Sequence, residues 1–269
     1  MNPSTERVRS FRELHQDGLL LLANVWDAGS AKLVEQAGAK AIATTSAGVA
    51  WSLGYPDGDA LPIAKLADAV AAIVRVLRVP LTADMEAGYS DDPSVVAENA
   101  MRLIDAGAAG INLEDGSGEP ALLCAKIEAI KRAAAKAGAD LFVNARTDMY
   151  LAGLAPEPQR VDATLARARD YREAGADGLF VPGVVEGHEI RAIASGIALP
   201  LNIMARPALP AGDELQSWGV RRLSAGPYLI ASAYARAANL AGRFLQDGLS
   251  KPLTEDAMGY GDINAWFES

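Results

Sequence analysis

The sequence predicts a (β/α)8 TIM barrel, the α/β fold in which eight parallel strands alternate with helices and close into a ring. Eight short apolar or β-branched runs recur along the 269 residues, separated by longer alanine-rich segments whose apolar residues have helical spacing. Most of these runs lack polar alternation until their last residues, as expected of parallel strands that are buried on both faces. A barrel of this kind needs about 250 residues, which matches the length of the chain.

A weak internal repeat gives the same order of elements. The segments EQAGAKAIATTS, IDAGAAGINLED, REAGADGLFVPG and, more distantly, QSWGVRRLSAG each contain the end of a helix, a small-residue stop and a strand. Glycine at the stop fits a left-handed helix cap before the turn into the next strand. We therefore interpret residues 1–269 as a single barrel domain.

The predicted strands, in chain order, are Leu19 to Trp26, Ala41 to Ala47, Pro80 to Glu86, Gly110 to Asp115, Leu141 to Asp148, Gly178 to Gly183, Pro200 to Ala205 and Arg222 to Gly226. The segments between them are the predicted helices. From about Ser250 a Lys-Pro break leads into an acidic segment that ends in Trp266 and Phe267. Residues 241–269 are predicted to be a C-terminal helical extension that docks on the barrel or on a neighbouring subunit.

Composition excludes several classes of function. The 34 acidic residues outnumber the 25 basic ones, and a net charge of −9 without a Lys/Arg cluster argues against nucleic-acid and membrane-surface partners. The polar N-terminus has no apolar core and no stretch approaches the ~20 apolar residues of a membrane span, so we expect a cytoplasmic protein. One cysteine, Cys124, and two histidines, His15 and His188, cannot form a Cys/His zinc site, so any metal must have oxygen ligands.

Carboxylates cluster where the predicted strands end, which is the reactive face of such a barrel. Asp84 and Glu86 end the third strand two residues apart, so strand alternation predicts that both side chains face the barrel mouth. Glu114 ends the fourth strand, and Asp57 lies in the loop GYPDGDA after the second. Some of these acids could cap helices or solvate loops. Their convergence would be repulsive without a cation, and Mg²⁺, or else Mn²⁺, suits an all-oxygen, partly hydrated site.

Other polar residues at the strand ends predict a site for an anionic substrate. Arg146 and Asn144 share one face of the fifth strand, and the planar guanidinium of Arg146 suits a carboxylate or phosphate; a salt bridge to Asp148 is the structural alternative. The backbone N–H groups of residues 44–48 could hold an anion. Asn202, at the end of the seventh strand, is either a neutral substrate contact or a turn former.

Some barrel chemistries are disfavoured by what the sequence lacks. No predicted strand contains an internal lysine, so Schiff-base aldol chemistry has no nucleophile. The loop SAGPY after the last strand has one glycine, which gives little support for a phosphate cup. Neither histidine is expected to act as a general acid or base.

Five motifs, ANVWDAGSA, TTSAGVAWSLGYPDGD, LTADMEAGYSDDP, INLEDG and VNARTDMYL, occur in this order, and the sequence resembles the isocitrate lyase/phosphoenolpyruvate mutase superfamily over roughly residues 15–240. The resemblance implies a (β/α)8 barrel whose last helix is exchanged between the subunits of a homodimer or homotetramer. It also implies Mg²⁺ and a small 2-oxo carboxylate substrate. In this superfamily C–C or P–C bonds are made or broken next to an enolate.

The resemblance also implies roles for individual residues at the barrel mouth. It implies that Asp84 is the direct metal ligand, supported mostly through bound waters by Asp57, Glu86 and Glu114. It implies that the substrate carboxylate is held by the backbone N–H groups of Ser46, Ala47 and Gly48. Arg146 would bind a carboxylate or phosphonate oxygen.

Two departures from the superfamily pattern bear on the reaction. Lyases of the superfamily carry a long gating loop with a Lys-Lys/Arg-Cys-Gly-His segment that supplies a proton. Here Glu114-Asp115 is followed by GSGEPALLCAKIEAIKRA, which is predicted to enter a helix at once and to place Cys124 there as a small apolar residue. Gly183 stands where isocitrate-type lyases have glutamate. Both departures disfavour isocitrate and methylisocitrate cleavage, and the proton donor is unassigned.

The sequence thus favours a Mg²⁺-dependent lyase that cleaves or forms a C–C bond in a small 2-oxo or 2-hydroxy di- or tricarboxylate through an enolate. One alternative is P–C chemistry on phosphonopyruvate or phosphoenolpyruvate, although the mutase gate is also missing. The other alternative is a binding protein that keeps the 2-oxo acid site and has no catalytic activity.

Overall fold

The computed structural model describes residues 3–268 and shows the predicted parallel barrel. The first barrel strand is split into β1 (Leu20–Leu22) and β2 (Asn24–Val25). The others are β3 (Ile42–Thr44), β4 (Leu81–Asp84), β5 (Gly110–Glu114), β6 (Phe142–Arg146), β7 (Gly178–Val181), β8 (Leu201–Met204) and β9 (Val220–Ser224). Every pairing is parallel, and because β1 pairs with β9 and β2 with β3, the sheet closes almost completely around its axis.

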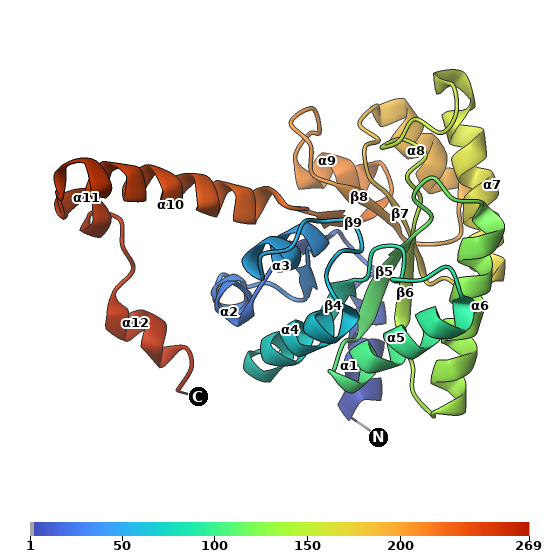
Figure 1. Cartoon of the computed structure of the whole chain (residues 1–269). Helices are drawn as coiled ribbons and strands as arrows, with labels where there is room; N and C mark the ends of the chain where they lie inside the picture. The colour runs from blue at the N-terminus through green and yellow to red at the C-terminus, as the bar shows by residue number, and fades with distance from the viewer. Residues whose placement is uncertain (1–2, 269) are drawn as a thin grey trace.

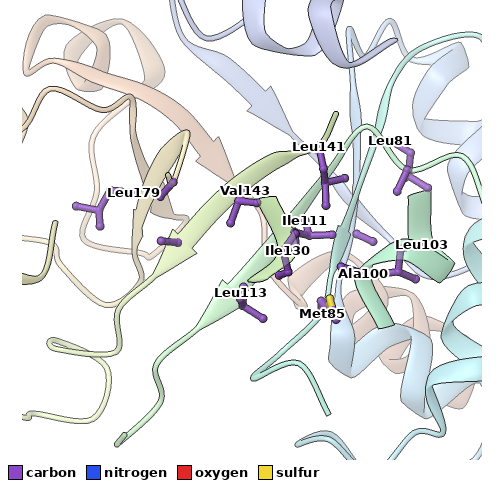
Figure 2. Packing of buried hydrophobic residues seen from close by; sticks show 14 of the residues in the cluster. Leu81, Met85, Ala100, Leu103, Ile111, Leu113, Ile130, Leu141, Val143 and Leu179 are labelled. Atoms are coloured by element: carbon purple, nitrogen blue, oxygen red, sulfur yellow. The ribbon is translucent and has the colours of Figure 1, made fainter. Parts of the chain in front are cut away.

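Helices cover the outside of the barrel, as the repeat predicted (Figure 1). They are α2 (Ala28–Gln36), α3 (Ser46–Ser52), α4 (Ile63–Val76), α5 (Pro93–Asp105), α6 (Pro120–Lys136), a 3-10 turn η1 (Glu157–Gln159), α7 (Arg160–Glu173), α8 (Gly187–Gly196) and α9 (Gly212–Ser217). The main core lies between strands and helices. Figure 2 shows Ile111 and Val143 of neighbouring strands packed near Leu103 of α5 and Ile130 of α6.

Strand boundaries differ from the sequence prediction mostly at the carboxyl ends. The predicted strand Ala41 to Ala47 stops at Thr44, because Thr45 is already the N-cap of α3. The last strand begins at Val220, two residues before its predicted start. Residues Thr45 to Ala47 therefore belong to the start of a helix and not to the second strand.

The helix α1 (Pro3–Glu13) closes the amino end of the barrel. Phe11 of α1 packs edge-on against Phe142 of β6, with ring centroids 5.2 Å apart, and both are buried. His15, just beyond α1, stacks on Phe142 at 4.5 Å, and its Nδ1 lies 2.8 Å from the carbonyl oxygen of Phe11. These rings form a plug that seals the end of the barrel opposite the mouth.

The buried imidazole of His15 predicts a specific pH dependence of stability. Burial, with the positive charge of Arg222 adding to it, lowers the pKa of His15 from 6.5 to about 3. The unfolded chain therefore binds the proton more tightly, and stability falls as pH drops from 6.5 towards 3. Between pH 6 and pH 4 we expect His15 to account for a loss of about 2 to 3 kcal/mol in the free energy of unfolding.

Urea denaturation of the wild type and of His15→Gln at the two pH values measures this loss. The variant should lose correspondingly less stability on acidification, whereas His188→Gln, which changes the exposed second histidine, should behave like the wild type. Equal pH dependence in all three proteins would show that His15 is not buried as described.

The C-terminal part of the chain leaves the barrel. Helix α10 (Tyr228–Asp247), followed by α11 (Lys251–Thr254) and α12 (Tyr260–Ala265), projects away from it (Figure 1). The helical extension predicted for residues 241–269 is thus present over its described part, but it begins at Tyr228 and does not dock on its own barrel. Ile230 is the one buried residue of α10. No helix within residues 3–268 is both long and apolar enough to cross a membrane.

Candidate active site

A cavity of about 180 Å³ opens at the carboxyl ends of the strands. It is lined by residues from or just after every barrel strand, among them five of the predicted site residues: Ser46, Ala47, Asp57, Asp84 and Arg146. The other four predicted residues, Gly48, Glu86, Glu114 and Asn202, do not line it. The structure therefore brings part of the predicted site to one small cavity and places the rest around or below it.

Asp84 is the last residue of β4 and lies at the edge of the cavity. Its backbone N–H donates to Oγ1 of Thr44 at 2.8 Å, and its Oδ2 accepts from the backbone N–H of Ser46 at 3.3 Å. Its Oδ1 is buried and has no hydrogen-bond partner among residues 3–268. A buried carboxylate oxygen without a donor is costly. This oxygen fits a cation at the cavity.

A metal bound here would have few protein ligands. Among the described residues, no group of three or more His, Cys, Asp or Glu side chains is arranged to hold an ion directly. Asp84 and Asp57 both line the cavity. A site with one or two carboxylates and several waters is the coordination that Mg²⁺ favours.

Glu86 does not line the cavity beside Asp84, because the strand alternation on which its predicted orientation depended stops at Asp84. The strand ends at Asp84, and Glu86 has a left-handed backbone with φ 50°. Its Oε2 accepts from the backbone N–H groups of Gly58 at 2.8 Å and Asp59 at 2.5 Å. Glu86 therefore anchors the loop that carries Asp57.

Arg146 and Glu114 form an ion pair at the ends of β6 and β5, with 2.5 Å between Nη1 and Oε2. The Nε and Nη2 groups of Arg146 donate to the two oxygens of Asp148 at 2.7 and 2.9 Å. The structural alternative considered for Arg146 is therefore present, although Arg146 also lines the cavity. Burial raises the pKa of Glu114 to about 8, against the lowering effect of Arg146.

Asp115 supports this arrangement from behind. Its Oδ1 accepts from the backbone N–H of Asp148 at 3.0 Å, and its Oδ2 accepts from Arg167 and from the hydroxyl of Tyr171, each at 2.5 Å. Asp115 thus fixes the segment that orients Arg146.

The first turn of α3 forms another wall of the cavity. Thr45 is its N-cap without a side-chain cap, and the first intrahelical bond is donated by the backbone of Val49. The N–H groups of Ser46, Ala47 and Gly48 therefore have no acceptor within the helix. Gly48 also allows close packing, since a Cβ there would lie 2.6 Å from Cγ2 of Thr45.

The structure shows the local geometry at both departures from the superfamily pattern. Only residues 115–119 separate β5 from α6, so the short connection in place of a gating loop is confirmed. Cys124 lies in α6 as predicted, and burial raises the pKa of its thiol. Gly183 has φ 91°, and a Cβ there would lie 3.1 Å from the backbone nitrogen of Leu151. A glutamate at position 183 would be strained in this backbone conformation and would crowd the backbone of Leu151.

Sequence reasoning placed Asn144 and Asn202 at strand ends but missed Asn112 and Arg222, which belong to the same polar interior beneath the cavity. Asn112, Asn144, Asn202 and Arg222 occupy inward positions of four strands and are almost wholly buried. Asn202, predicted as a substrate contact, lies below the cavity, where its Oδ1 accepts from the hydroxyl of Ser224 at 3.1 Å. Polar residues at inward strand positions, where branched apolar ones are usual, were the available signal.

Comparison with known proteins identifies the family. The family model for phosphoenolpyruvate phosphomutase matches residues 11–245. The chain belongs to this family. The resemblance to the isocitrate lyase/phosphoenolpyruvate mutase superfamily seen in the motifs is thereby confirmed, and the chain is an enzyme of that superfamily.

Named relatives within the superfamily differ in activity. Oxaloacetate decarboxylase of Paraburkholderia xenovorans is 30% identical over 290 residues, covering 99% of this chain and 94% of that protein. 2-Methylisocitrate lyase of Escherichia coli is 34% identical over 229 residues, covering 78% and 74%. A crystal structure from Burkholderia cenocepacia J2315, named as a candidate phosphonomutase, has a TM-score of 0.84 at 42% identity and covers 89% of this chain and 99% of that one.

Proposed function

We propose that this enzyme is a Mg²⁺-dependent lyase that cleaves a C–C bond in a small 2-oxo dicarboxylate, such as oxaloacetate, through an enolate. The observation that carries the proposal is the unpartnered, buried Oδ1 of Asp84 in a cavity that Arg146 also lines. Asp84 thus offers a site for a cation, and Arg146 offers a site for an anion in the same cavity. A 2-oxo acid chelated to a metal needs a site for the metal and a site for its carboxylate.

The size of the cavity favours the smaller substrates of the superfamily. About 180 Å³ lies below the range of most ligand pockets, which suits a three- or four-carbon acid better than a tricarboxylate. Gly183, which stands where isocitrate-type lyases have glutamate, also argues against isocitrate-type substrates. The 30% identity to a named oxaloacetate decarboxylase across nearly the whole chain supports the same choice.

The residues of the chain would divide the work between metal and substrate. Asp84 would hold Mg²⁺ directly, with Asp57 and Glu114 accepting hydrogen bonds from its waters and Glu86 fixing the loop of Asp57. When bound, Mg²⁺ supplies positive charge that stabilises the oxyanion of the enolate. The N–H group of Ala47, together with that of Ser46, which Asp84 would share, would hold one carboxylate.

Arg146 would bind the second acidic group of the substrate. Its edge towards Asp148 is fixed, so a substrate carboxylate would contact Nη1, which pairs with Glu114. Substrate and Glu114 would then share this nitrogen. The cleaved bond leaves its electron pair on the substrate as the enolate, which takes up a proton at carbon after the leaving group departs.

One substrate panel with Mg²⁺ tests the proposal. We expect turnover of oxaloacetate or a close four-carbon 2-oxo dicarboxylate to exceed that of isocitrate, 2-methylisocitrate and phosphonopyruvate by at least about 100-fold in kcat/KM, and to stop on addition of EDTA. Preferred turnover of phosphonopyruvate would establish P–C chemistry instead. That alternative is kept because the matching family model is that of a phosphomutase. Tight Mg²⁺-dependent binding without any turnover would make the chain a binding protein.

A further inference from the structure

Arg222 of β9 is an unusual charge for the inside of a barrel. Its side chain is fully buried. Within residues 3–268 its hydrogen-bond partners are the neutral side chains of Asn112 and Ser224, and its Nη1 has no hydrogen-bond partner. Burial lowers the pKa of Arg222 to about 9, and the charge of Asp84 partly offsets this lowering. A buried cation without a paired anion is costly, so a purely structural role would be served better by an apolar residue.

The guanidinium lies directly beneath the cavity and contacts its floor. Its Nη2 donates to Oδ1 of Asn112 at 3.1 Å, and its Nε donates to Oγ of Ser224 at 3.4 Å. Asn112 and Ser224 both line the cavity, whereas Arg222 does not. Any influence of Arg222 on a ligand is therefore exerted through these two residues and through its charge.

These contacts set the direction of the Asn112 amide. A guanidinium can only donate, so the atom of Asn112 that faces it must be the oxygen. The same oxygen accepts from Nδ2 of Asn144 at 2.9 Å. With Oδ1 held by two donors below the floor, the Nδ2 group of Asn112 is the part left to face the cavity. The floor therefore presents a hydrogen-bond donor.

We propose that Arg222 is a positioning residue that fixes Asn112 as a donor to the substrate and places a permanent positive charge beneath the oxygen that becomes negative in the enolate. The inference rests on the proposed function and adds a residue that supports the same reaction. Donors and charges that are already oriented towards developing negative charge stabilise it without reorganisation. The Asn112 donor and the Arg222 charge should therefore stabilise the bound enolate form of the ligand more than the keto form.

Binding of two probes in the presence of Mg²⁺ distinguishes the two forms. Oxalate is a planar dianion that imitates the enolate of pyruvate, and pyruvate itself is the keto monoanion. In Arg222→Met we expect the affinity for oxalate to fall at least about 10-fold and that for pyruvate less than about 3-fold, measured by calorimetry. Arg222→Lys, which restores the charge, should recover part of the oxalate affinity.

Asn112→Asp keeps the test decisive if a change at Arg222 prevents folding. The aspartate can pair with Arg222 below the floor and presents an oxygen acceptor to the cavity in place of the donor, so oxalate affinity should again fall selectively. Equal losses for oxalate and pyruvate, or none, in folded variants would overturn the proposal. Failure of the wild type to bind either probe with Mg²⁺ would instead refute the proposed function.

Discussion

Asp84→Asn is expected to lower kcat/KM by more than about 100-fold, beyond the 10- to 100-fold that loss of an outer-shell partner of a metal site usually costs. Asparagine can keep the hydrogen bond from the Ser46 amide through one oxygen. It replaces the unpartnered oxygen by a neutral donor group, which repels a cation. The fold should therefore survive while the metal site is lost.

Thermal denaturation with and without Mg²⁺ and oxalate gives a readout independent of turnover. Ligand binding to the native state should raise the Tm of the wild type but not that of Asp84→Asn. Asp91→Asn is the matched control, since Asp91 follows the same strand but its side chain is 94% exposed. An unchanged Mg²⁺ response in Asp84→Asn would remove Asp84 as the metal ligand.

Placing charges on the apolar side of α10 is expected to convert an oligomer into monomers. The helix of 20 residues carries apolar side chains at helical spacing, including the exposed Tyr234 and Phe244, and buries little besides Ile230. The barrel has a matching apolar groove of about 660 Å³ outside β1, between α2 and α9, where Leu21 is 58% exposed. We propose that α10 of a second copy fills this groove.

Light scattering coupled to size-exclusion chromatography measures the effect. The wild type should elute as a dimer or tetramer, and Tyr234→Glu/Phe244→Glu should halve the mass or reduce it to that of a monomer. Arg243→Glu changes the charge on the polar side of the same helix and should leave the mass unchanged. A monomeric wild type would contradict the exchange of this helix between subunits.

Local pattern was enough to predict the barrel. Each of the eight runs overlaps a barrel strand, because its apolar sequence agrees with the helical spacing of the segments around it and, in the repeat, with a stop of small residues before the strand. Strand-end position also identified Asp84 and Arg146 as residues of the mouth. These features depend on spacing along the chain, which the sequence contains.

Other features depend on where the backbone turns or on partners far along the chain. The left-handed Glu86 follows from the loop it binds, 28 residues earlier, and no local pattern indicates that loop's position. Arg222 contacts Asn112, 110 residues away, inside a barrel that has to close before the contact exists. The course of α10 depends on packing that the barrel of one chain does not provide.

A crystal structure with Mg²⁺ and oxalate would show directly whether Asp84 holds the metal beside the substrate. We predict one ion bound to Oδ1 of Asp84, with oxalate in the same cavity between that ion, the amides of Ser46 and Ala47, and Nη1 of Arg146. An ion bound away from Asp84, or oxalate bound outside this cavity, would contradict it.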